Sequence, residues 1–160
     1  VGMALSIFLY TKKANREFFQ VTDFVLPAVP IGLFFGRLAN FVNQELWGTV
    51  TNLPWGVIFT HPGAGGVPRH PTQIYEAILE GFVLFFILRV VSSRNVGTGY
   101  VTGCFFFFYG VFRSAIEFLR VPDAHIGYIH ADYLTMGHVL SIPLILFGLL
   151  LIARTRKKMV

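Results

Sequence analysis

Long blocks of apolar residues alternate with short polar segments along this chain. Four complete blocks cover about residues 21–42, 74–91, 100–119 and 134–153, and a shorter block covers residues 1–10. A helix rises about 1.5 Å per residue, so each complete block is long enough to cross about 30 Å of hydrocarbon. Because lipid cannot satisfy the backbone groups of an open strand, we expect every block to be helical. The pattern predicts an all-α, polytopic transmembrane helical bundle with four complete spans and one partial span at the N-terminus.

The composition agrees with a lipid environment. Apolar residues make up 54% of the 160 residues and charged residues 13%, against roughly 25% charged residues in soluble domains. The net charge of +5 comes from basic residues in short clusters between the apolar blocks. Anionic lipid headgroups would meet them there, so we expect no nucleic-acid partner. We treat residues 1–160 as one transmembrane domain and expect sequence upstream of Val1, because residues 1–10 are too short to span alone.

Small residues and prolines predict details of the helix packing. Pro27 and Pro30 predict a kink early in the block over residues 21–42. Gly32 and Gly36 in that block, and Gly99 with Gly103 in a later one, have the spacing of closely packed membrane helices. The single cysteine, Cys104, excludes an internal disulfide and a multi-cysteine metal site, and we expect it to pack in the core.

Basic residues predict the orientation in the membrane. Nine of them fall on one side of the predicted spans: Lys12, Lys13, Arg16, Arg89, Arg94, Arg154, Arg156, Lys157 and Lys158. The other side receives Arg37, Arg69, Arg113 and Arg120. The positive-inside rule therefore places the C-terminus in the cytoplasm and the loop over residues 43–73 outside it. Trp47 and Trp55 in this loop would be interfacial anchors or part of a small folded cap.

Arg37 and Arg113 lie within or at the end of apolar blocks, so their positive charges need a partner. An unpaired charge at the centre of a membrane helix costs about 2.5–3.5 kcal/mol on insertion scales. Around Arg113, one helix stripe carries Tyr109, Arg113, Glu117 and Arg120. We expect that face to line a polar cavity or to contact another helix. Arg37 shares a second face with Asn40 and Gln44, and both faces open on the same side of the membrane.

The chemistry of these arginines favours an anion. A guanidinium presents a fork of donors that matches phosphate oxygens and keeps its charge, so a phospholipid headgroup would suit the pair. The competing interpretation is structural: Glu45 or Glu117 neutralises an arginine and locks the helices together. None of the histidines, His61, His70, His125, His130 and His138, stands out as catalytic. No metal-ligand spacing, serine-hydrolase elbow or glycine-rich phosphate loop is present, so we predict no metal and no cofactor.

Four motifs together resemble one known family. They are Gly-Arg-Leu-Ala-Asn-Phe-Val-Asn-Gln-Glu-Leu-Trp-Gly at 36–48, Arg-His-Pro-Thr-Gln-Ile-Tyr-Glu at 69–76, Tyr109 to Arg113 continuing through Glu117 to Asp123, and Leu134 to Gly137 with Ser141-Ile142-Pro143. Their order and spacing are similar to those of the prolipoprotein diacylglyceryl transferases over essentially the whole chain. The family's His-Gly-Gly segment would lie just upstream of Val1, so the histidine it supplies has no counterpart here. The chain would then be the C-terminal part of a larger enzyme.

The resemblance implies a membrane transferase that starts lipoprotein maturation. The lipobox cysteine thiol of a preprolipoprotein would attack the glycerol carbon that bears the phosphate of phosphatidylglycerol. A thioether would form and glycerol 1-phosphate would leave. The enzyme would be a multi-pass protein of the bacterial inner membrane with its active site toward the periplasm. We expect residues 1–160 alone to be inactive.

The resemblance also implies roles for individual residues. Arg37 and Arg113 would bind the phosphate and offset charge on the departing oxygen, with Tyr109 and Glu117 completing a catalytic stripe. The implied substrate-binding residues also include Asn40, Glu45, Gly48, His70, Gln73, Tyr75 and Arg120. The base for the thiol stays open between the upstream histidine, His70 and Tyr75. A polytopic anion or phospholipid transporter or binding protein is the alternative function, and a silent structural partner in a membrane complex is a third.

Overall fold

The computed structural model describes residues 2–121 and 135–156. Several residues considered above lie outside this range: Val1, Asp123, His125, His130, Leu134, Lys157 and Lys158. The helical segments are α1 (Gly2–Lys13), α2 (Phe18–Val25), the 3-10 turn η1 (Leu26–Ala28), α3 (Val29–Val42), α4 (Thr72–Glu76), the π-helical segment η3 (Ala77–Val83), α5 (Leu84–Ser92), α6 (Tyr100–Glu117) and α7 (Met136–Arg156). A small sheet contains β1 (Val57–Ile58) and β2 (Pro68–Arg69), with the 3-10 turn η2 (Pro62–Ala64) between them.

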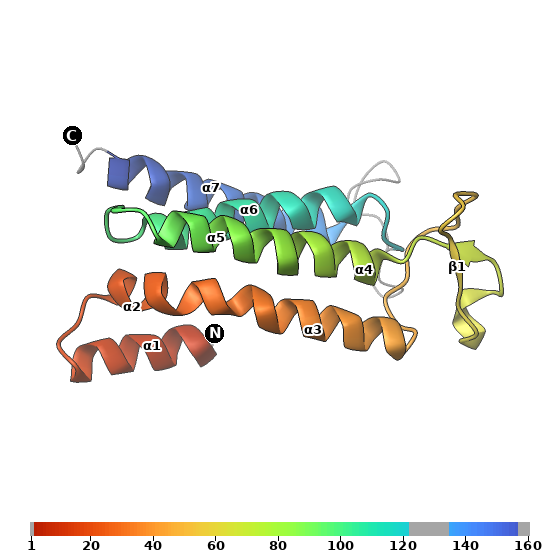
Figure 1. The fold of residues 1–160 in the computed structure, drawn as a ribbon, viewed down its shortest axis with the longest axis horizontal. Helices are drawn as coiled ribbons and strands as arrows, with labels where there is room; N and C mark the ends of the chain where they lie inside the picture. The colour runs from red at the N-terminus through yellow and green to blue at the C-terminus, as the bar shows by residue number, and fades with distance from the viewer. Residues whose placement is uncertain (1, 122–134, 157–160) are drawn as a thin grey trace.

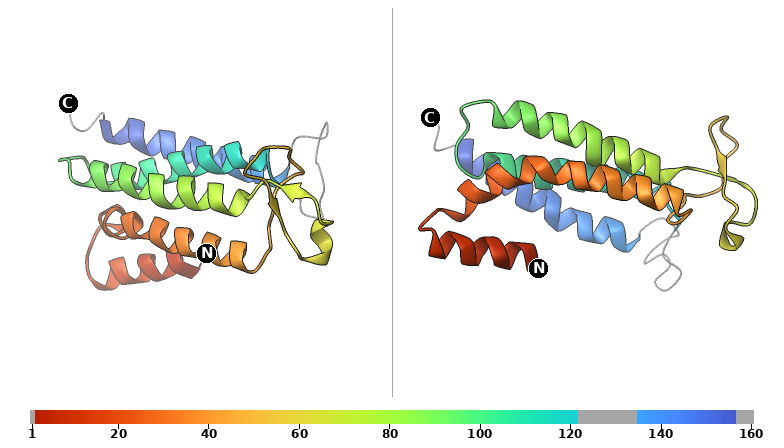
Figure 2. Two further views of the ribbon diagram at one scale, coloured as in Figure 1. Left: turned by 45° about the vertical axis from the view of Figure 1, so that its right-hand side comes forward. Right: turned by 60° about the horizontal axis from the view of Figure 1, so that its bottom comes forward.

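The helices run side by side in an elongated bundle, as Figures 1 and 2 show. The turns after α1 and α5 and the end of α7 lie at one end of the bundle, and the sheet lies at the other end. Consecutive segments join into longer helices, first α2, η1 and α3 and later α4, η3 and α5. The predicted irregularity near Pro27 and Pro30 is present, because the 3-10 turn η1 interrupts the α-helix there.

The chain is mostly helical, in agreement with an all-α membrane protein. Within the described residues, the helices Phe18–Val42 and Met136–Thr155 are long and apolar enough, by length and composition, to cross a membrane. Each of the five predicted apolar blocks falls on a helical segment. The number of spans stays a prediction.

The N-terminus of α6 is capped by a residue of another helix. Asp23 of α2 accepts hydrogen bonds from the backbone nitrogens of Gly99 and Thr102, at 2.6 and 2.8 Å, and from Thr102 Oγ1 at 2.5 Å. The first N–H groups of a helix have no partner within it, and its positive end favours a carboxylate. Asp23 therefore fixes α2 against the start of α6.

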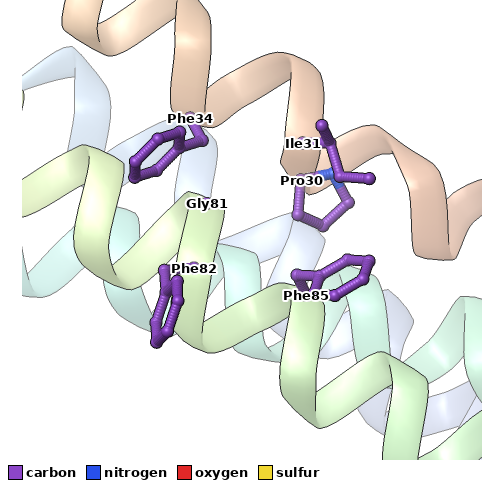
Figure 3. A pocket seen from close by; sticks show the side chains of 6 residues that line it. All are labelled: Pro30, Ile31, Phe34, Gly81, Phe82 and Phe85. Atoms are coloured by element: carbon purple, nitrogen blue, oxygen red, sulfur yellow. The ribbon is translucent and has the colours of Figure 1, made fainter.

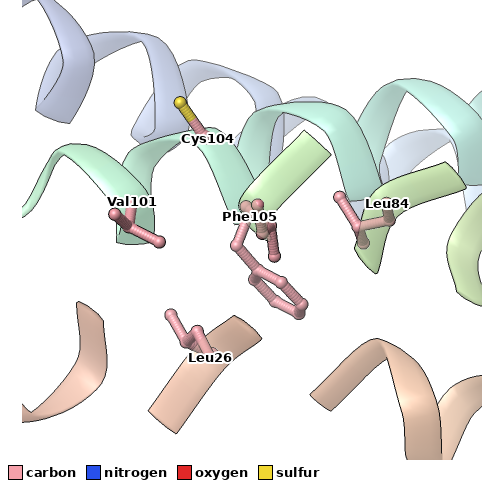
Figure 4. Close-up of a cluster of buried hydrophobic side chains, with 6 residues drawn as sticks. Leu26, Leu84, Val101, Cys104 and Phe105 are labelled. Atoms are coloured by element: carbon pink, nitrogen blue, oxygen red, sulfur yellow. The ribbon is translucent and has the colours of Figure 1, made fainter. Parts of the chain in front are cut away.

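The core lies where η1, α5 and α6 meet. Its buried side chains are Leu26, Leu84, Leu88, Val101, Cys104 and Phe105. Figure 4 shows Leu26, Leu84 and Phe105 directed toward a common interior. The predicted core position of Cys104 is confirmed, since the side chain is a buried free thiol.

Glycine allows α6 and α7 to pack closely, whereas the two glycines of α3 make no such contact among the described residues. A Cβ on Gly103 would lie 3.0 Å from the carbonyl oxygen of Gly148 in α7, so these backbones are in near contact. A Cβ on Gly32 or Gly36 would have no neighbour within 4 Å among the described residues. The close approach of α3 to η3 is instead at Gly81, where an added Cβ would lie 2.9 Å from Phe34 Cα.

The segment after α3 contains the small sheet and lies at one end of the bundle (Figure 1), and we call residues 43–73 the cap. β1 and β2 pair antiparallel, and isolated bridges join Gly48 to Arg120 and Val50 to Arg69. The expected helical face containing Gln44 is wrong, because α3 ends at Val42 and Gln44 has a positive φ of 55°. Gln44 Oε1 instead accepts hydrogen bonds from the backbone nitrogens of Thr60 and His61 and so holds the loop of the cap.

Candidate functional site

Three arginines and three glutamates converge between α3, the α4–η3 helix and the end of α6. We call these six residues the ion-pair cluster: Arg37, Glu76, Glu80, Arg113, Glu117 and Arg120. The glutamates are 0–6% exposed, whereas the arginine side chains keep 11–17% exposure. The carboxyl groups therefore form the interior of the cluster, and the guanidinium groups form its accessible side.

Glu76 is the centre of the cluster. Its Oε1 lies 2.7 Å from Arg113 Nη1 and 3.9 Å from Arg120 Nη1, and its Oε2 lies 3.4 Å from Arg37 Nε. One carboxylate thus contacts all three arginines, which come from segments far apart in the sequence. Because the side chain is fully buried, it has little freedom to adopt another position. Glu76 fixes the separation of Arg37 and Arg113.

Glu80 lies one turn after Glu76 and supports Arg37. Its Oε2 lies 3.3 Å from Arg37 Nη2. Its other oxygen is buried and has no hydrogen-bond partner among the described residues. A buried polar atom without a partner is uncommon in native proteins and is typical of a site that another group completes.

Glu117 holds Arg113 from the opposite side. Its Oε2 lies 2.8 Å from Arg113 Nη2, one turn earlier on the same helix. Its Oε1 accepts a hydrogen bond of 2.6 Å from Thr135 Oγ1, which lies just before α7. Arg113 is therefore clamped between Glu76 and Glu117.

The pairing explains how these charges are tolerated and what they can still bind. Removing one partner from a buried pair costs about 3–5 kcal/mol, because the remaining charge is left uncompensated. Three cationic groups face three carboxyl groups here, so compensation comes from within the bundle. A guanidinium has more N–H donors than the two ion pairs of Arg37 or of Arg113 engage. Both side chains therefore retain donors, now in a fixed orientation, for a further anion.

Tyr109 extends the polar stripe of α6, as predicted. Its ring stacks on Phe105 with centroids 5.8 Å apart and planes 3° from parallel. The predicted contact of this stripe with other helices is confirmed by the ion pair between Arg113 and Glu76.

An apolar groove adjoins the cluster. It has a volume of about 130 Å³ and is lined by Pro30, Ile31, Phe34, Gly81, Phe82 and Phe85. Figure 3 shows these side chains around the gap between α3 and the α4–α5 helix. Phe34 lies one turn before Arg37, and Gly81 directly follows Glu80. An apolar chain in this groove would therefore lie next to the charged residues.

Gly48 lies where three segments of the cap meet. A Cβ there would be 2.6 Å from the Leu119 carbonyl oxygen, and 2.7 Å from both His70 Cβ and Thr72 Cγ2. Its backbone nitrogen donates to the His70 carbonyl at 2.9 Å. Gly48 thus lets the cap approach the end of α6 near Arg120, and its role in substrate binding stays a prediction.

Other predicted site residues lie at the junction of cap and bundle. Gln73 is buried, and its Nε2 donates to the Glu45 carbonyl at 2.6 Å. Glu45 is exposed, and its carboxylate accepts from Asn43 Nδ2 at 3.4 Å. Asn40 is half-buried near the end of α3, where its carbonyl accepts from the Glu45 nitrogen. Among the described residues, the carboxylates that pair with these arginines are those of Glu76, Glu80 and Glu117, and the pairing suggested for Glu45 is wrong.

His70 and Tyr75 form a separate group at the start of α4. Tyr75 OH accepts a hydrogen bond of 2.8 Å from Trp55 Nε1 and lies 3.3 Å from His70 Nδ1. Trp55 therefore binds the cap to this helix through its indole nitrogen. Neither His70 nor Tyr75 contacts an arginine of the ion-pair cluster through a hydrogen bond among the described residues.

Sequence reasoning left Glu76, Glu80 and Thr135 out of the site. The signal for the two glutamates was present, because carboxylates one turn apart in a predicted span need partners. Thr135 gave no comparable signal, since its contact with Glu117 depends on how α7 packs. No group of three His, Cys, Asp or Glu side chains positioned to hold a metal ion occurs in residues 2–121 and 135–156.

Comparisons with known proteins identify the family of this chain. A family described as prolipoprotein diacylglyceryl transferase matches residues 1–154. The chain is 50% identical over 154 residues to a phosphatidylglycerol--prolipoprotein diacylglyceryl transferase of Solidesulfovibrio magneticus, covering 96% of this chain and 58% of that protein. Proteins with the same name from Methylococcus capsulatus and Pseudomonas aeruginosa are 50% and 46% identical, covering 96% and 94% of this chain and 58% and 56% of their own lengths. The chain thus spans less than two thirds of these curated relatives, and it belongs to the prolipoprotein diacylglyceryl transferase family.

Proposed function

We propose that the whole protein transfers the diacylglyceryl group of phosphatidylglycerol to the lipobox cysteine of a preprolipoprotein. The observation that carries the proposal is the buried carboxylate of Glu76 between Arg37 and Arg113, which presents two oriented guanidinium groups within a membrane bundle. Relatives of this name act on phosphatidylglycerol and prolipoprotein, as their names state.

The reaction is a displacement at the glycerol carbon that bears the phosphate. The thiol loses its proton, the sulfur forms a bond to that carbon, and the carbon–oxygen bond to the phosphate breaks. The phosphate oxygen keeps the electron pair and leaves as glycerol 1-phosphate, while the thioether remains on the cysteine. Negative charge therefore moves from sulfur to the phosphate. Donors already aimed at the phosphate stabilise this change without reorganising.

The ion-pair cluster binds the headgroup. Arg37 and Arg113 hold the phosphate through the N–H donors that their ion pairs leave, and Glu76 keeps both guanidinium groups in place. Tyr109, Glu117 and Arg120 complete the polar wall. The apolar groove beside Arg37 accepts part of an acyl chain of the lipid. A lipid joins an anionic headgroup to apolar chains, and this site likewise places cationic groups next to an apolar groove.

Residues at the junction of the cap and the bundle also contribute. Asn40 and Glu45 orient the headgroup at the end of α3, and Gly48 and Gln73 maintain the junction between cap and bundle. His70 and Tyr75 contact the approaching peptide. The base that takes the thiol proton is one of these two or a histidine of the larger enzyme, and the reaction uses no metal or cofactor.

The protein is a multi-pass inner-membrane protein with four complete spans and one partial span in residues 1–160. Its C-terminus is cytoplasmic, and the cap over residues 43–73 lies on the periplasmic side with the site. The position of the cap opposite the end of α7 supports this arrangement (Figure 1). So does the accumulation of lysine and arginine at the other end, as the positive-inside rule expects.

A transfer assay tests the function. The full-length protein is reconstituted in phosphatidylglycerol vesicles with a peptide that carries a lipobox cysteine, and the product is measured by mass spectrometry. We expect a diacylglyceryl thioether with phosphatidylglycerol, and no product with phosphatidylcholine or with a peptide that has serine in place of the cysteine. Absence of the thioether under all these conditions would overturn the proposal.

A further inference from the structure

Thr135, just before α7, and Gly137, in its first turn, lie against the carboxylate of Glu117. Thr135 Oγ1 donates to Glu117 Oε1 at 2.6 Å. A Cβ on Gly137 would overlap the same carboxylate. Glu117 is 6% exposed and Thr135 is 3% exposed, so water cannot replace the threonine donor without a rearrangement.

His138 supports Thr135 from its other side. Its Nδ1 lies 3.2 Å from Thr135 Oγ1 and 3.4 Å from the Thr135 backbone nitrogen. The imidazole is 5% exposed and packs on Phe118 with ring centroids 4.4 Å apart. The threonine is therefore confined between an imidazole and a carboxylate, and its hydroxyl has one defined acceptor on α6.

The other oxygen of Glu117 contacts Arg113 at 2.8 Å. A carboxylate has two oxygens in one rigid plane, so fixing Oε1 with the threonine also fixes Oε2 against the guanidinium. A continuous chain of contacts thus runs from α7 through Glu117 to Arg113. Glu76 holds the same guanidinium at its other terminal nitrogen, 2.7 Å away.

We propose that Thr135 and Gly137 are positioning residues, which set the orientation of Arg113 through Glu117. Thr135 supplies the hydrogen bond that stops the carboxylate from turning away, and Gly137 supplies the space that it occupies. The kinetic consequence rests on the proposed function, since it assumes that Arg113 stabilises the leaving phosphate. The structural consequence, a guanidinium with restricted rotation, does not depend on any reaction.

The first test measures kcat and KM for transfer in the full-length protein. Thr135→Val keeps the shape and removes the donor, and we expect kcat to fall about tenfold or more, as for a lost hydrogen bond to a charged group. The KM for phosphatidylglycerol should change much less, because Glu76 still holds Arg113. Thr135→Ser keeps the hydroxyl and should restore kcat.

The matched control is Thr155→Val, near the end of α7. Thr155 is also buried, but its hydroxyl donates only to the Leu151 carbonyl of its own helix, at 2.7 Å. It should leave kcat unchanged. If Thr135→Val and Thr155→Val have the same kcat, or if Thr135→Ser stays as slow as the valine variant, the positioning role is overturned.

The steric part is tested with Gly137→Ala. The atoms that the new methyl group would meet are the end of a flexible side chain, so we expect the fold to tolerate it while Glu117 moves. Gly32→Ala, where a Cβ meets nothing within 4 Å among the described residues, is the control. Loss of kcat in Gly137→Ala with an unchanged thermal unfolding midpoint supports the proposal, and normal kcat contradicts it.

An NMR measurement tests the positioning role of Thr135 independently of the proposed transfer reaction. In protein labelled with ¹⁵N-arginine, the Nη resonances of Arg113 are assigned by their loss in Arg113→Lys. We expect slow guanidinium rotation in the unmodified protein and faster rotation in Thr135→Val, with no change in Thr155→Val. Unchanged rotation in Thr135→Val would overturn the positioning role. An unmodified protein with slow rotation but no transferase activity would overturn only the proposed function.

Discussion

Glu76 Oε1 and Arg113 Nη1 are 2.7 Å apart, the shortest of the ion pairs within the described residues. The two residues come from α4 and α6, and the same glutamate contacts Arg37 of α3. The relative position of the two arginines therefore depends on one buried carboxylate.

Glu76→Gln should disrupt both stability and transfer. The amide keeps the shape but leaves Arg37 and Arg113 without their central counter-charge, which we expect to destabilise the protein by about 3 kcal/mol. Transfer activity should fall at least tenfold. Thermal unfolding and the transfer assay measure the two effects. Glu17→Gln changes an exposed glutamate at the far end of the bundle and should alter neither.

Arg113→Lys distinguishes two roles of Arg113: binding of the phosphate, and a purely structural ion pair that holds the helices together. Lysine keeps the charge but lacks the fork that reaches Glu76, Glu117 and a phosphate together. We expect kcat to fall about 10²-fold or more, as when an oriented donor to a developing anion is lost, while the protein still folds and inserts. Arg37→Ala should have a similar effect on transfer. Near-normal turnover in Arg113→Lys would favour the purely structural ion pair. Arg89→Lys, at an exposed position, provides the control.

Gly48→Ala should displace the cap. The added methyl group meets a backbone oxygen and two side chains at 2.6–2.7 Å, and such overpacking costs about 1–3 kcal/mol. The expected results are a lower unfolding midpoint, faster proteolysis within the cap and reduced transfer. In Gly63→Ala, the new Cβ would lie 3.4 Å or more from its nearest neighbours, so that cap variant should behave like the unmodified protein.

The proposed orientation can be tested with a membrane-impermeant thiol reagent. In a Cys104→Ser background, Asn52→Cys labels the cap and Asn95→Cys labels the turn between α5 and α6. Both native side chains are exposed, so the new thiols should be accessible from their own side. We expect labelling of Asn52→Cys from the periplasm and of Asn95→Cys only after the membrane is opened. Labelling of both from the periplasm would exclude the orientation.

Much of the fold follows from local sequence, whereas the partners within the site do not. The helices were predictable because apolar blocks of sufficient length must be helical in lipid. The stripe Tyr109, Arg113 and Glu117 was predictable because residues at this spacing share a helix face.

The identity of the counter-charges required the tertiary structure. Glu45 and Glu117 were the carboxylates close in sequence to the two arginines, and only Glu117 pairs with one. Glu76 is 39 positions from Arg37 and 37 from Arg113 in the chain, so no local pattern links them. Gln44 was assigned to a helix face because the end of α3 at Val42 has no strong local stop signal.

The distribution of charge in the ion-pair cluster affects how the protein is assembled. As separate helices, α3 would bring Arg37 into the bilayer alone, and the α4–α5 helix would bring Glu76 and Glu80 together. Each uncompensated charge costs about 2.5–3.5 kcal/mol at the centre of a bilayer. This cost is removed when the helices pack together and the charges pair. Stable insertion of α3 and of the α4–α5 helix therefore depends on their association with each other. Until α6 docks, Glu76 lacks Arg113, so the half-assembled bundle retains an uncompensated charge that only the docking of α6 removes.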